Sequence, residues 1–223
     1  MVTDGGKALT TQTIRQQLST FGVEVSGIQV VCIQQYIRIL MQWNEKLNLT
    51  AIRDPLEMLV RHFCESMYGA VAVPIKSGRL ADIGSGAGFP GIPMKILYPE
   101  IQLFLVESNI KKGTFLAEVV RELGLKDTRV LISRYEELDE ELTPLDVVCS
   151  RAVGDFGPFL GWAGSEKVSA GKVVLWIGGR DLEEVKKSEG WEWQEPLAVP
   201  QSLRRYLLVG LKKQPNVGLT TTK

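Results

Sequence analysis

A glycine-rich segment and an acidic residue one β-type run later have the types and spacing that hold a nucleoside. The segment DIGSGAGFPG extends from Asp82 to Gly91, and Gly84 and Gly86 let its backbone approach a ligand closely. Glu107 ends the next β-type run, at the distance along the chain where a carboxylate accepts both hydroxyls of a ribose. This spacing is shared by NAD and S-adenosylmethionine sites, so it predicts a nucleoside ligand without choosing between the two.

The charge of the loop distinguishes these two ligands. GAGFPG satisfies the pattern G-x-G-x-x-G, which alone is a weak signal for a dinucleotide. We expect Asp82 at the mouth of the loop, where a carboxylate repels a pyrophosphate and attracts an ammonium group. Pro90 and Pro93 remove backbone N–H donors that a phosphate would use. We therefore favour S-adenosylmethionine, which has an ammonium group, a ribose diol and no phosphate; a tight turn without a ligand is the alternative.

Two later segments follow β-type runs and carry polar side chains. In SRYEE, Glu136 has the chemistry to accept a hydrogen bond from an adenine amino group, or it belongs to a solvated acidic helix start. Arg151 directly follows the next β-type run, and ligands of parallel sheets bind at the carboxyl ends of the strands. Its alternative role is to pair with a nearby acid such as Asp155.

The elements that must position these residues change character near residues 76–79. Before this point, helical spacing of apolar residues predicts amphipathic helices over 28–47 and 54–71, the second with Asp54 as N-cap and Pro55 at its first position. After it, β-type runs alternate with helical ones, which predicts an α/β fold with a mostly parallel sheet and helices on both faces. The expected strands are 79–83, 101–107, 128–132, 145–150, 172–177 and 205–211.

This change divides the chain into three parts. We expect an N-terminal helical extension over 1–75, a ligand-binding core over 76–213 and a flexible tail over 214–223. The polar start of the chain, to about residue 13, is also expected to be frayed.

Composition excludes several other classes of function. The 223 residues carry 26 Lys and Arg against 26 Asp and Glu, so no overall positive field indicates a nucleic-acid partner. No apolar run approaches the roughly 20 residues that span a bilayer, and the start lacks the layout of a secretory signal, so we expect a cytoplasmic protein. Three scattered cysteines and one histidine argue against a metal site.

Several motifs taken together resemble a known family. WNEKLNLT (43–50), Arg61-His62, DIGSGAGFPGIP (82–93), VESN (106–109), SRYEE (133–137) and SRAV (150–153) occur in one chain and in this order. This order resembles bacterial small-subunit ribosomal RNA guanine-N7 methyltransferases, also called the glucose-inhibited division protein B family. The resemblance covers residues 36–180.

The resemblance implies a class I methyltransferase fold, which is Rossmann-like, with a short N-terminal helical extension. It implies S-adenosyl-L-methionine as cofactor and small-subunit ribosomal RNA, free or in a ribosomal subunit, as partner. Residues at family cofactor-contacting positions are Gly84, Phe89, Tyr135, Glu136 and Arg151. Asp82, Gly86 and Glu107 join this set from their own chemistry. The alternatives are the same fold methylating another RNA, a protein or a small molecule, and a non-catalytic RNA-binding or assembly factor that retains the cofactor pocket.

The chemistry that the resemblance implies needs no general base, because guanine N7 carries a lone pair and no proton. No residue is therefore assigned as catalytic, and Arg151 is the candidate. RNA contacts are expected at Arg53, Arg61, His62, Lys111 and Lys112. For Arg61 the alternative is ordinary pairing with Glu57 and Glu65 along its helix.

Four places depart from the family pattern. Ile177 stands where lysine is common, and Glu65 stands where aspartate is usual. Ile110 interrupts the basic run after Asn109, and RRYL (204–207) replaces a stretch that frequently contains histidine. These departures concern the RNA contacts more than the cofactor.

Overall fold

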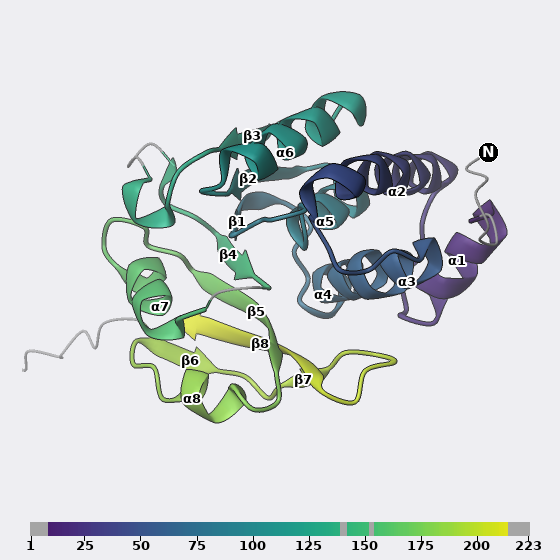
Figure 1. The fold of residues 1–223 in the computed structure, drawn as a ribbon. Helices are drawn as coiled ribbons and strands as arrows, with labels where there is room; N and C mark the ends of the chain where they lie inside the picture. The colour runs from purple at the N-terminus through teal and green to yellow at the C-terminus, as the bar shows by residue number, and fades with distance from the viewer. Residues whose placement is uncertain (1–8, 139–141, 152–153, 214–223) are drawn as a thin grey trace, which may run out of the picture.

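A central β-sheet with helices on both faces organises the chain, as the alternating pattern predicted (Figure 1). The structure is a computed structural model that describes residues 9–138, 142–151 and 154–213. The predicted tail 214–223 lies outside these residues, and so do the first eight residues and the second half of SRAV.

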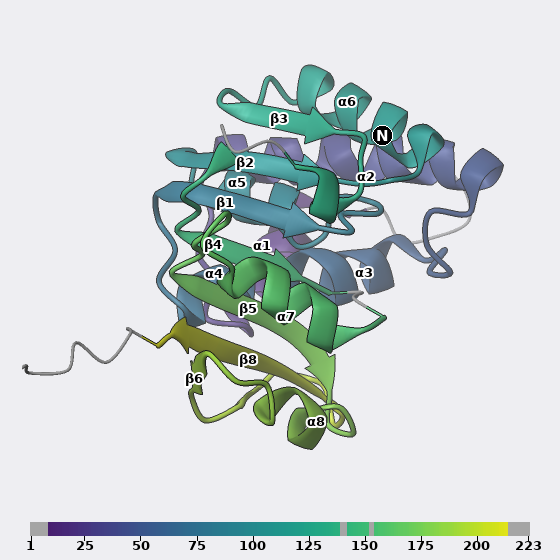
Figure 2. The ribbon, with the colours of Figure 1, turned by 90° about the vertical axis from the view of Figure 1, so that its left-hand side faces the viewer.

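The sheet has the strand order β3-β2-β1-β4-β5-β8-β6, with β7 paired to β8. Figure 2 shows the strands one above another, from β3 at one edge to β8 and β6 at the other. The first five strands are parallel, and they are β1 (Gly78–Ile83), β2 (Ile101–Val106), β3 (Thr128–Leu131), β4 (Val147–Ser150) and β5 (Lys172–Gly178). The antiparallel part consists of β6 (Trp191–Trp193), β7 (Leu197–Ala198) and β8 (Arg205–Lys212). The strand order reverses between β1 and β4, which is where such sheets bind ligands.

Two buried clusters hold helices against the two faces of the sheet. On one face lie α1 (Thr11–Ser19), α2 (Gly27–Leu47), α3 (Pro55–Met58), the π-helical turn η1 (Leu59–Cys64), α4 (Glu65–Ala72), α5 (Gly91–Leu97) and α6 (Ile110–Glu122). On the other lie α7 (Phe156–Gly164) and α8 (Leu182–Lys186), and the short 3₁₀ turn η2 (Tyr135–Glu137) follows β3. Among the described residues, no helix combines the length and apolarity that a bilayer crossing requires.

Local sequence signals account for the two predicted N-terminal helices. Ser26 and Gln29 form a reciprocal cap at the start of α2, with N···O distances of 2.8 and 3.3 Å. Ile33 and Leu40 are fully buried on one side of this helix, as the periodicity predicted. The Asp54 carboxylate accepts a hydrogen bond from the Glu57 N–H at 2.7 Å, which confirms the predicted N-cap.

Other elements were not predicted because their own residues are poor signals. Helix α1 begins at Thr11, so the expectation of a frayed start was wrong for residues 11–13; Ile14 and Leu18 bury one side of this otherwise polar helix. Helix α7 contains three glycines and a proline, which have low helix propensity, yet it buries Phe159 and Leu160 against the sheet. Tertiary burial outweighs propensity in both helices.

The N-terminal helices share one buried cluster with a face of the sheet. That cluster joins Leu40 and Phe63 from the predicted extension to Leu80 and Leu105 from the sheet. The predicted boundary between residues 75 and 76 therefore separates two stretches of sequence that share one hydrophobic core. That the two parts have separate functions stays a prediction.

Candidate functional site

The glycine loop connects β1 to α5 at the point where the strand order reverses. Gly84, Gly86 and Gly88 have φ angles of +66°, +58° and +83°, a region that residues with a Cβ rarely adopt. Tyr36 on α2 donates its hydroxyl hydrogen bond to the Ala87 carbonyl from behind the loop. The sequence therefore encodes both the turn and a helix residue that holds it.

Asp82 lies beneath this loop, which differs from the expected place at its mouth. The side chain is fully buried, and its Oδ2 accepts the N–H of Gly91 at 2.9 Å, at the start of α5. Side chains alternate along a strand, so residue 82 faces the same side of the sheet as Leu80, which is the side that α5 covers. The structure gives Asp82 the role of a buried brace of the loop rather than that of an open acid.

Burial raises the pKa of the Asp82 carboxyl from its ordinary 3.8 to about 7, against the lowering effect of the Gly91 N–H. A carboxyl with a higher pKa in the folded chain binds more protons there, so its contribution to the free energy of unfolding falls as pH rises from about 4 to about 7. Asp82→Asn keeps an acceptor for Gly91 and cannot titrate. We expect the variant to lose less stability than the parent between about pH 5 and pH 8 in urea unfolding. Equal losses in both proteins would show that Asp82 does not titrate in this range.

Glu107 connects the loops that follow β1 and β2. Its two carboxylate oxygens accept the N–H groups of Gly86 and Asn109, each at 2.9 Å. The residue is 7% exposed and also lines a cavity. A carboxylate oxygen accepts more than one hydrogen bond, so Glu107 can hold the loop and still face a ligand hydroxyl.

That cavity has a volume of about 300 Å³ and opens at the carboxyl ends of the strands. Its aromatic wall is Tyr135, whose ring packs edge to face on Trp162 and Phe159 at centroid distances of 5.0 and 6.0 Å. The lining residues are Ile83, Gly84, Val106, Glu107, Ser108, Ser133, Arg134, Tyr135, Glu136, Gly154 and Asp155. The fold thus brings together four of the predicted cofactor residues, namely Gly84, Glu107, Tyr135 and Glu136.

Phe89 lies behind the loop, outside the lining of this cavity. Its ring stacks on Tyr36 and on His62, at centroid distances of 5.5 and 4.5 Å, and the residue is 7% exposed. The aromatic cluster anchors the loop to α2 and η1. A contact between the Phe89 side chain and the cofactor stays a prediction, and the observed contacts support an anchoring role.

His62 is neutral at physiological pH. Burial, followed by the charges of Arg151 and Arg61, lowers its pKa to about 3. Its Nε2 lies 2.9 Å from the Thr50 hydroxyl, which joins η1 to the segment after α2. The predicted contact of His62 with RNA stays a prediction, and the low pKa favours a contact through the neutral ring.

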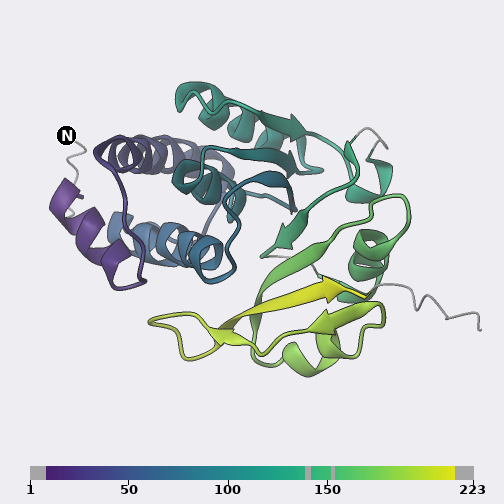
Figure 3. The same cartoon turned by 180° about the vertical axis from the view of Figure 1, so that it is seen from behind.

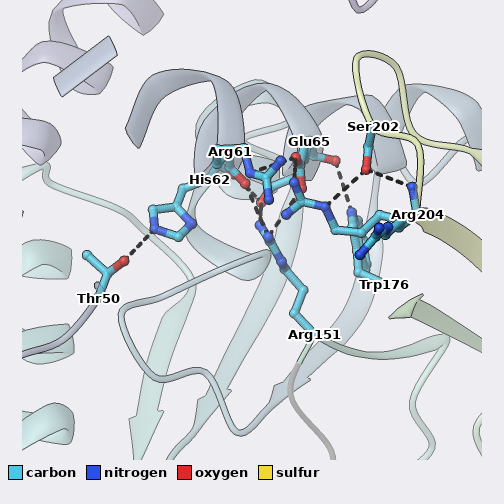
Figure 4. A network of polar contacts seen from close by, with 10 residues as sticks. Thr50, Arg61, His62, Glu65, Arg151, Trp176, Ser202 and Arg204 are labelled. Atoms are coloured by element: carbon cyan, nitrogen blue, oxygen red, sulfur yellow. Dashed lines mark hydrogen bonds and ion pairs between the residues drawn. The ribbon is translucent and has the colours of Figure 1, made fainter. Parts of the chain in front are cut away.

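Glu65 is the centre of a cluster of arginines (Figure 4). The carboxylate is 3.8 Å from Arg61, 3.3 Å from Arg151 and 2.8 Å from Arg205. Arg151 also donates to the Arg61 carbonyl at 3.1 Å and to the Ser66 hydroxyl at 3.3 Å. Arg151 therefore pairs with an acid, as the alternative had it, but the acid is Glu65 and not Asp155.

Arg205 is a site residue that the sequence reasoning missed. It begins β8, opposite Gly178 at the end of β5, so the antiparallel strand returns it to the carboxyl edge of the sheet. The only signal for it in the sequence was the pair of arginines in RRYL, which marked a departure from the family pattern.

The other basic residues predicted to contact RNA form no ion pair with Glu65. Arg53 is exposed and donates to the Asn44 carbonyl at 3.0 Å and to Asn48 Oδ1 at 2.9 Å, so it binds the end of α2. Lys111 and Lys112 lie in the first turn of α6, with Lys111 exposed. Their contacts with RNA stay predictions.

A second, smaller cavity of about 120 Å³ lies at the ends of β4 and β5. It is lined by Ser150, Arg151, Phe156, Leu175, Trp176, Ile177, Gly178 and Asp181. Arg151 lines this cavity, and Gly154 and Asp155, a few residues later, line the larger one. The segment after β4 thus contributes to both cavities. No three His, Cys, Asp or Glu side chains within the described part of the chain are grouped so that they could hold a metal ion.

Comparisons with known proteins identify the family of the chain. Residues 29–203 match the family described as rRNA small subunit methyltransferase G. A ribosomal RNA small subunit methyltransferase G from Xylella fastidiosa is 40% identical over 195 residues, which cover 86% of this chain and 91% of the relative. One from Dichelobacter nodosus is 44% identical over 182 residues, which cover 82% and 85%.

Solved structures share the fold at low identity. A SAM dependent methyltransferase from Aquifex aeolicus has a TM-score of 0.56 and 15% identity, over 74% of this chain and 97% of that one. A precorrin-6y C5,15-methyltransferase from Geobacter metallireducens has a TM-score of 0.55 and 15% identity, over 66% and 87%. The predicted class I methyltransferase fold is confirmed.

Proposed function

The chain belongs to the family of rRNA small subunit methyltransferases G, and from this premise we propose that it methylates N7 of a guanine in small-subunit ribosomal RNA. Members of this family are S-adenosylmethionine-dependent enzymes, so the cofactor predicted from the glycine loop is the family's own. The base and the atom that receive the methyl group belong to the proposal.

The observation that carries the proposal is the 300 Å³ cavity at the switch point of the sheet. Its volume and its mixed lining suit a nucleoside. Glu107 has free acceptor capacity for ribose hydroxyls, and Tyr135 with Glu136 offers a ring face and an acceptor for adenine. The residues present therefore fit S-adenosylmethionine. When bound, this group supplies a methyl group on a positively charged sulfonium.

The protein's own contribution to this reaction is alignment in a dry site. Guanine N7 offers an in-plane lone pair and holds no proton, so no side chain has to remove one. His62 is held against Thr50 and Phe89 and lies outside the lining of the cavity, which agrees with a mechanism that uses no histidine base. Arg151 is the candidate for a catalytic residue. It lines the smaller cavity, and Gly154 and Asp155, which follow it closely in the sequence, line the larger one.

We propose that the RNA approaches the carboxyl edge of the sheet, where the basic groups Arg61, Arg151 and Arg205 gather. The partner is small-subunit ribosomal RNA, free or assembled, and a cytoplasmic location follows from that partner. The predicted contacts at Arg53, Lys111 and Lys112 belong to the same proposal.

The function is tested by mass spectrometry of ribosomal RNA from cells with and without the protein. We expect 7-methylguanosine to be missing from one position of small-subunit RNA in cells that lack it. Purified protein with S-adenosylmethionine should restore the methyl group on that RNA, and parallel reactions with free RNA and with small subunits identify the better substrate. Methylation of another molecule would contradict the assigned substrate, and RNA binding without methyl transfer would indicate an assembly factor.

A further inference from the structure

Glu65 and its three arginines carry more positive charge than the cluster can neutralise. Arg61, Arg151 and Arg205 contact one carboxylate, which leaves an excess of two positive charges when Glu65 is ionised. Burial raises the pKa of Glu65 to about 7, against the lowering effects of Arg151 and Arg61, and protonation would only increase the excess. Like charges held this close repel one another, so the arrangement favours the arrival of an anion.

Two guanidinium atoms in this cluster also make no well-aligned hydrogen bond within the described residues. Nε of Arg61 and Nη2 of Arg205 are buried and make no hydrogen bond, although both lie beside the Glu65 carboxylate as ion pairs. Buried N–H donors in folded proteins nearly always have a partner. These two donors therefore face Glu65 without an aligned hydrogen bond, and it is the exposed atoms of the same guanidinium groups that can bind an acceptor from outside the chain.

The acid of the cluster is buried, whereas two of its arginines are partly exposed to solvent. The side chains of Arg61 and Arg205 are 40% and 23% exposed, whereas that of Glu65 is 2% exposed. Trp176 donates to the Glu65 carbonyl at 3.0 Å, which fixes the acid at the carboxyl end of β5. An anion can reach the arginines without displacing the carboxylate.

The loop between β7 and β8 fixes Arg205 from the other side. Ser202 Oγ accepts the Arg205 Nε–H at 3.4 Å, and Gln201 donates to the Thr20 hydroxyl at 2.7 Å. Figure 3 shows this loop extending from the yellow strand β8 toward the N-terminal helices. Arg205 is thus held between the antiparallel edge of the sheet and the helical layer.

We propose that Arg61 and Arg205 bind one phosphate group of the substrate RNA, and that Glu65 is the positioning residue that orients their guanidinium groups. A planar guanidinium donates two parallel hydrogen bonds to a phosphate, and a buried carboxylate that fixes it in advance lowers the ordering cost of binding. The phosphate belongs to the RNA because S-adenosylmethionine has none. The identity of the RNA rests on the proposed function.

The first test removes Arg205 and measures RNA binding as a function of salt. Arg205→Ala should weaken the binding of small-subunit ribosomal RNA roughly 10- to 100-fold and reduce the log–log salt slope by about 1. Arg205→Lys should keep the parent's salt slope, because it keeps the positive charge. It should recover only part of the RNA affinity, because an ammonium group cannot donate the two parallel hydrogen bonds of a guanidinium group. Calorimetry should give the same S-adenosylmethionine affinity for the parent and for both variants.

Lys212→Ala is the matched control. Lys212 lies on the same strand, β8, but at its other end, where it pairs with Trp191 and approaches Ser169. This variant removes the same charge from the opposite edge of the sheet, so it should keep the parent's slope. An unchanged slope in Arg205→Ala would overturn the phosphate site. An unchanged slope together with weaker S-adenosylmethionine binding would assign the anion to the cofactor's carboxylate instead.

The second test separates positioning by Glu65 from its charge. Glu65→Gln keeps the shape and increases the positive charge of the cluster, so an effect of charge alone would tighten RNA binding. We expect the opposite, a KM for RNA raised severalfold, with thermal unfolding used to verify the fold. Tighter binding would overturn the positioning role. If the parent does not methylate the RNA, the proposed function fails, whereas the salt slopes still decide the phosphate site.

Discussion

Replacing Gly86 with valine is expected to abolish binding of S-adenosylmethionine while the chain still folds. Gly86 has a φ of +58°, which costs a residue with a Cβ about 1–2 kcal/mol. Its N–H also donates to Glu107 at 2.9 Å, and a backbone that leaves this conformation loses that charge-assisted bond, worth about 1.5–3 kcal/mol. Both losses act on the loop that borders the cavity, so the affinity should fall by about 100-fold or more.

The fold should survive because a Cβ at this position meets only the Gly84 carbonyl oxygen, at 3.7 Å. Gly124→Val is the matched control: Gly124 has a φ of +60° and open space around its Cβ, and it follows the end of α6 that is opposite to Glu107. Calorimetry should detect binding in the control and none in Gly86→Val, and urea unfolding should show that both variants still fold. Parent-like affinity in Gly86→Val would mean that the loop does not border the cofactor.

Glu107→Ala is expected to weaken S-adenosylmethionine binding by about 1–3 kcal/mol, or roughly 5- to 150-fold. The carboxylate lines the cavity and fixes the N–H groups of Gly86 and Asn109, so its loss removes a ligand acceptor and two supports of the loop together. RNA binding measured without cofactor should stay near that of the parent, because Glu107 belongs to the cavity and not to the arginine cluster.

Glu118→Ala provides a control for the loss of a hydrogen-bonded acid. Glu118 lies on α6 and accepts the Trp43 Nε1–H at 3.1 Å, away from the lining of the cavity. Its removal should cost stability and leave the calorimetric affinity unchanged. Equal affinities in Glu107→Ala and the parent would exclude the acid from the cofactor site.

The sequence determined those features whose signals lie within one element or one turn. Alternating β-type and helical runs predicted the parallel sheet, and Asp54 predicted the start of α3. The glycine loop and Glu107 were predicted together because each ends or follows a strand, and the carboxyl ends of neighbouring parallel strands meet at one edge. Of the four predicted cofactor residues that line the cavity, Glu107 came from this local reasoning, whereas Gly84, Tyr135 and Glu136 came from the family resemblance.

Only the tertiary structure decided which side chains meet across long stretches of chain. Asp82 is buried because strand alternation directs it toward α5, and Phe89 stacks on Tyr36 because α2 crosses behind the loop. Glu65 and Arg205 lie 2.8 Å apart because β8 runs antiparallel to β5, so that its first residue, Arg205, lies at the carboxyl end of β5. The order and direction of strands depend on how the whole core packs, so no pattern near either residue could predict that pairing.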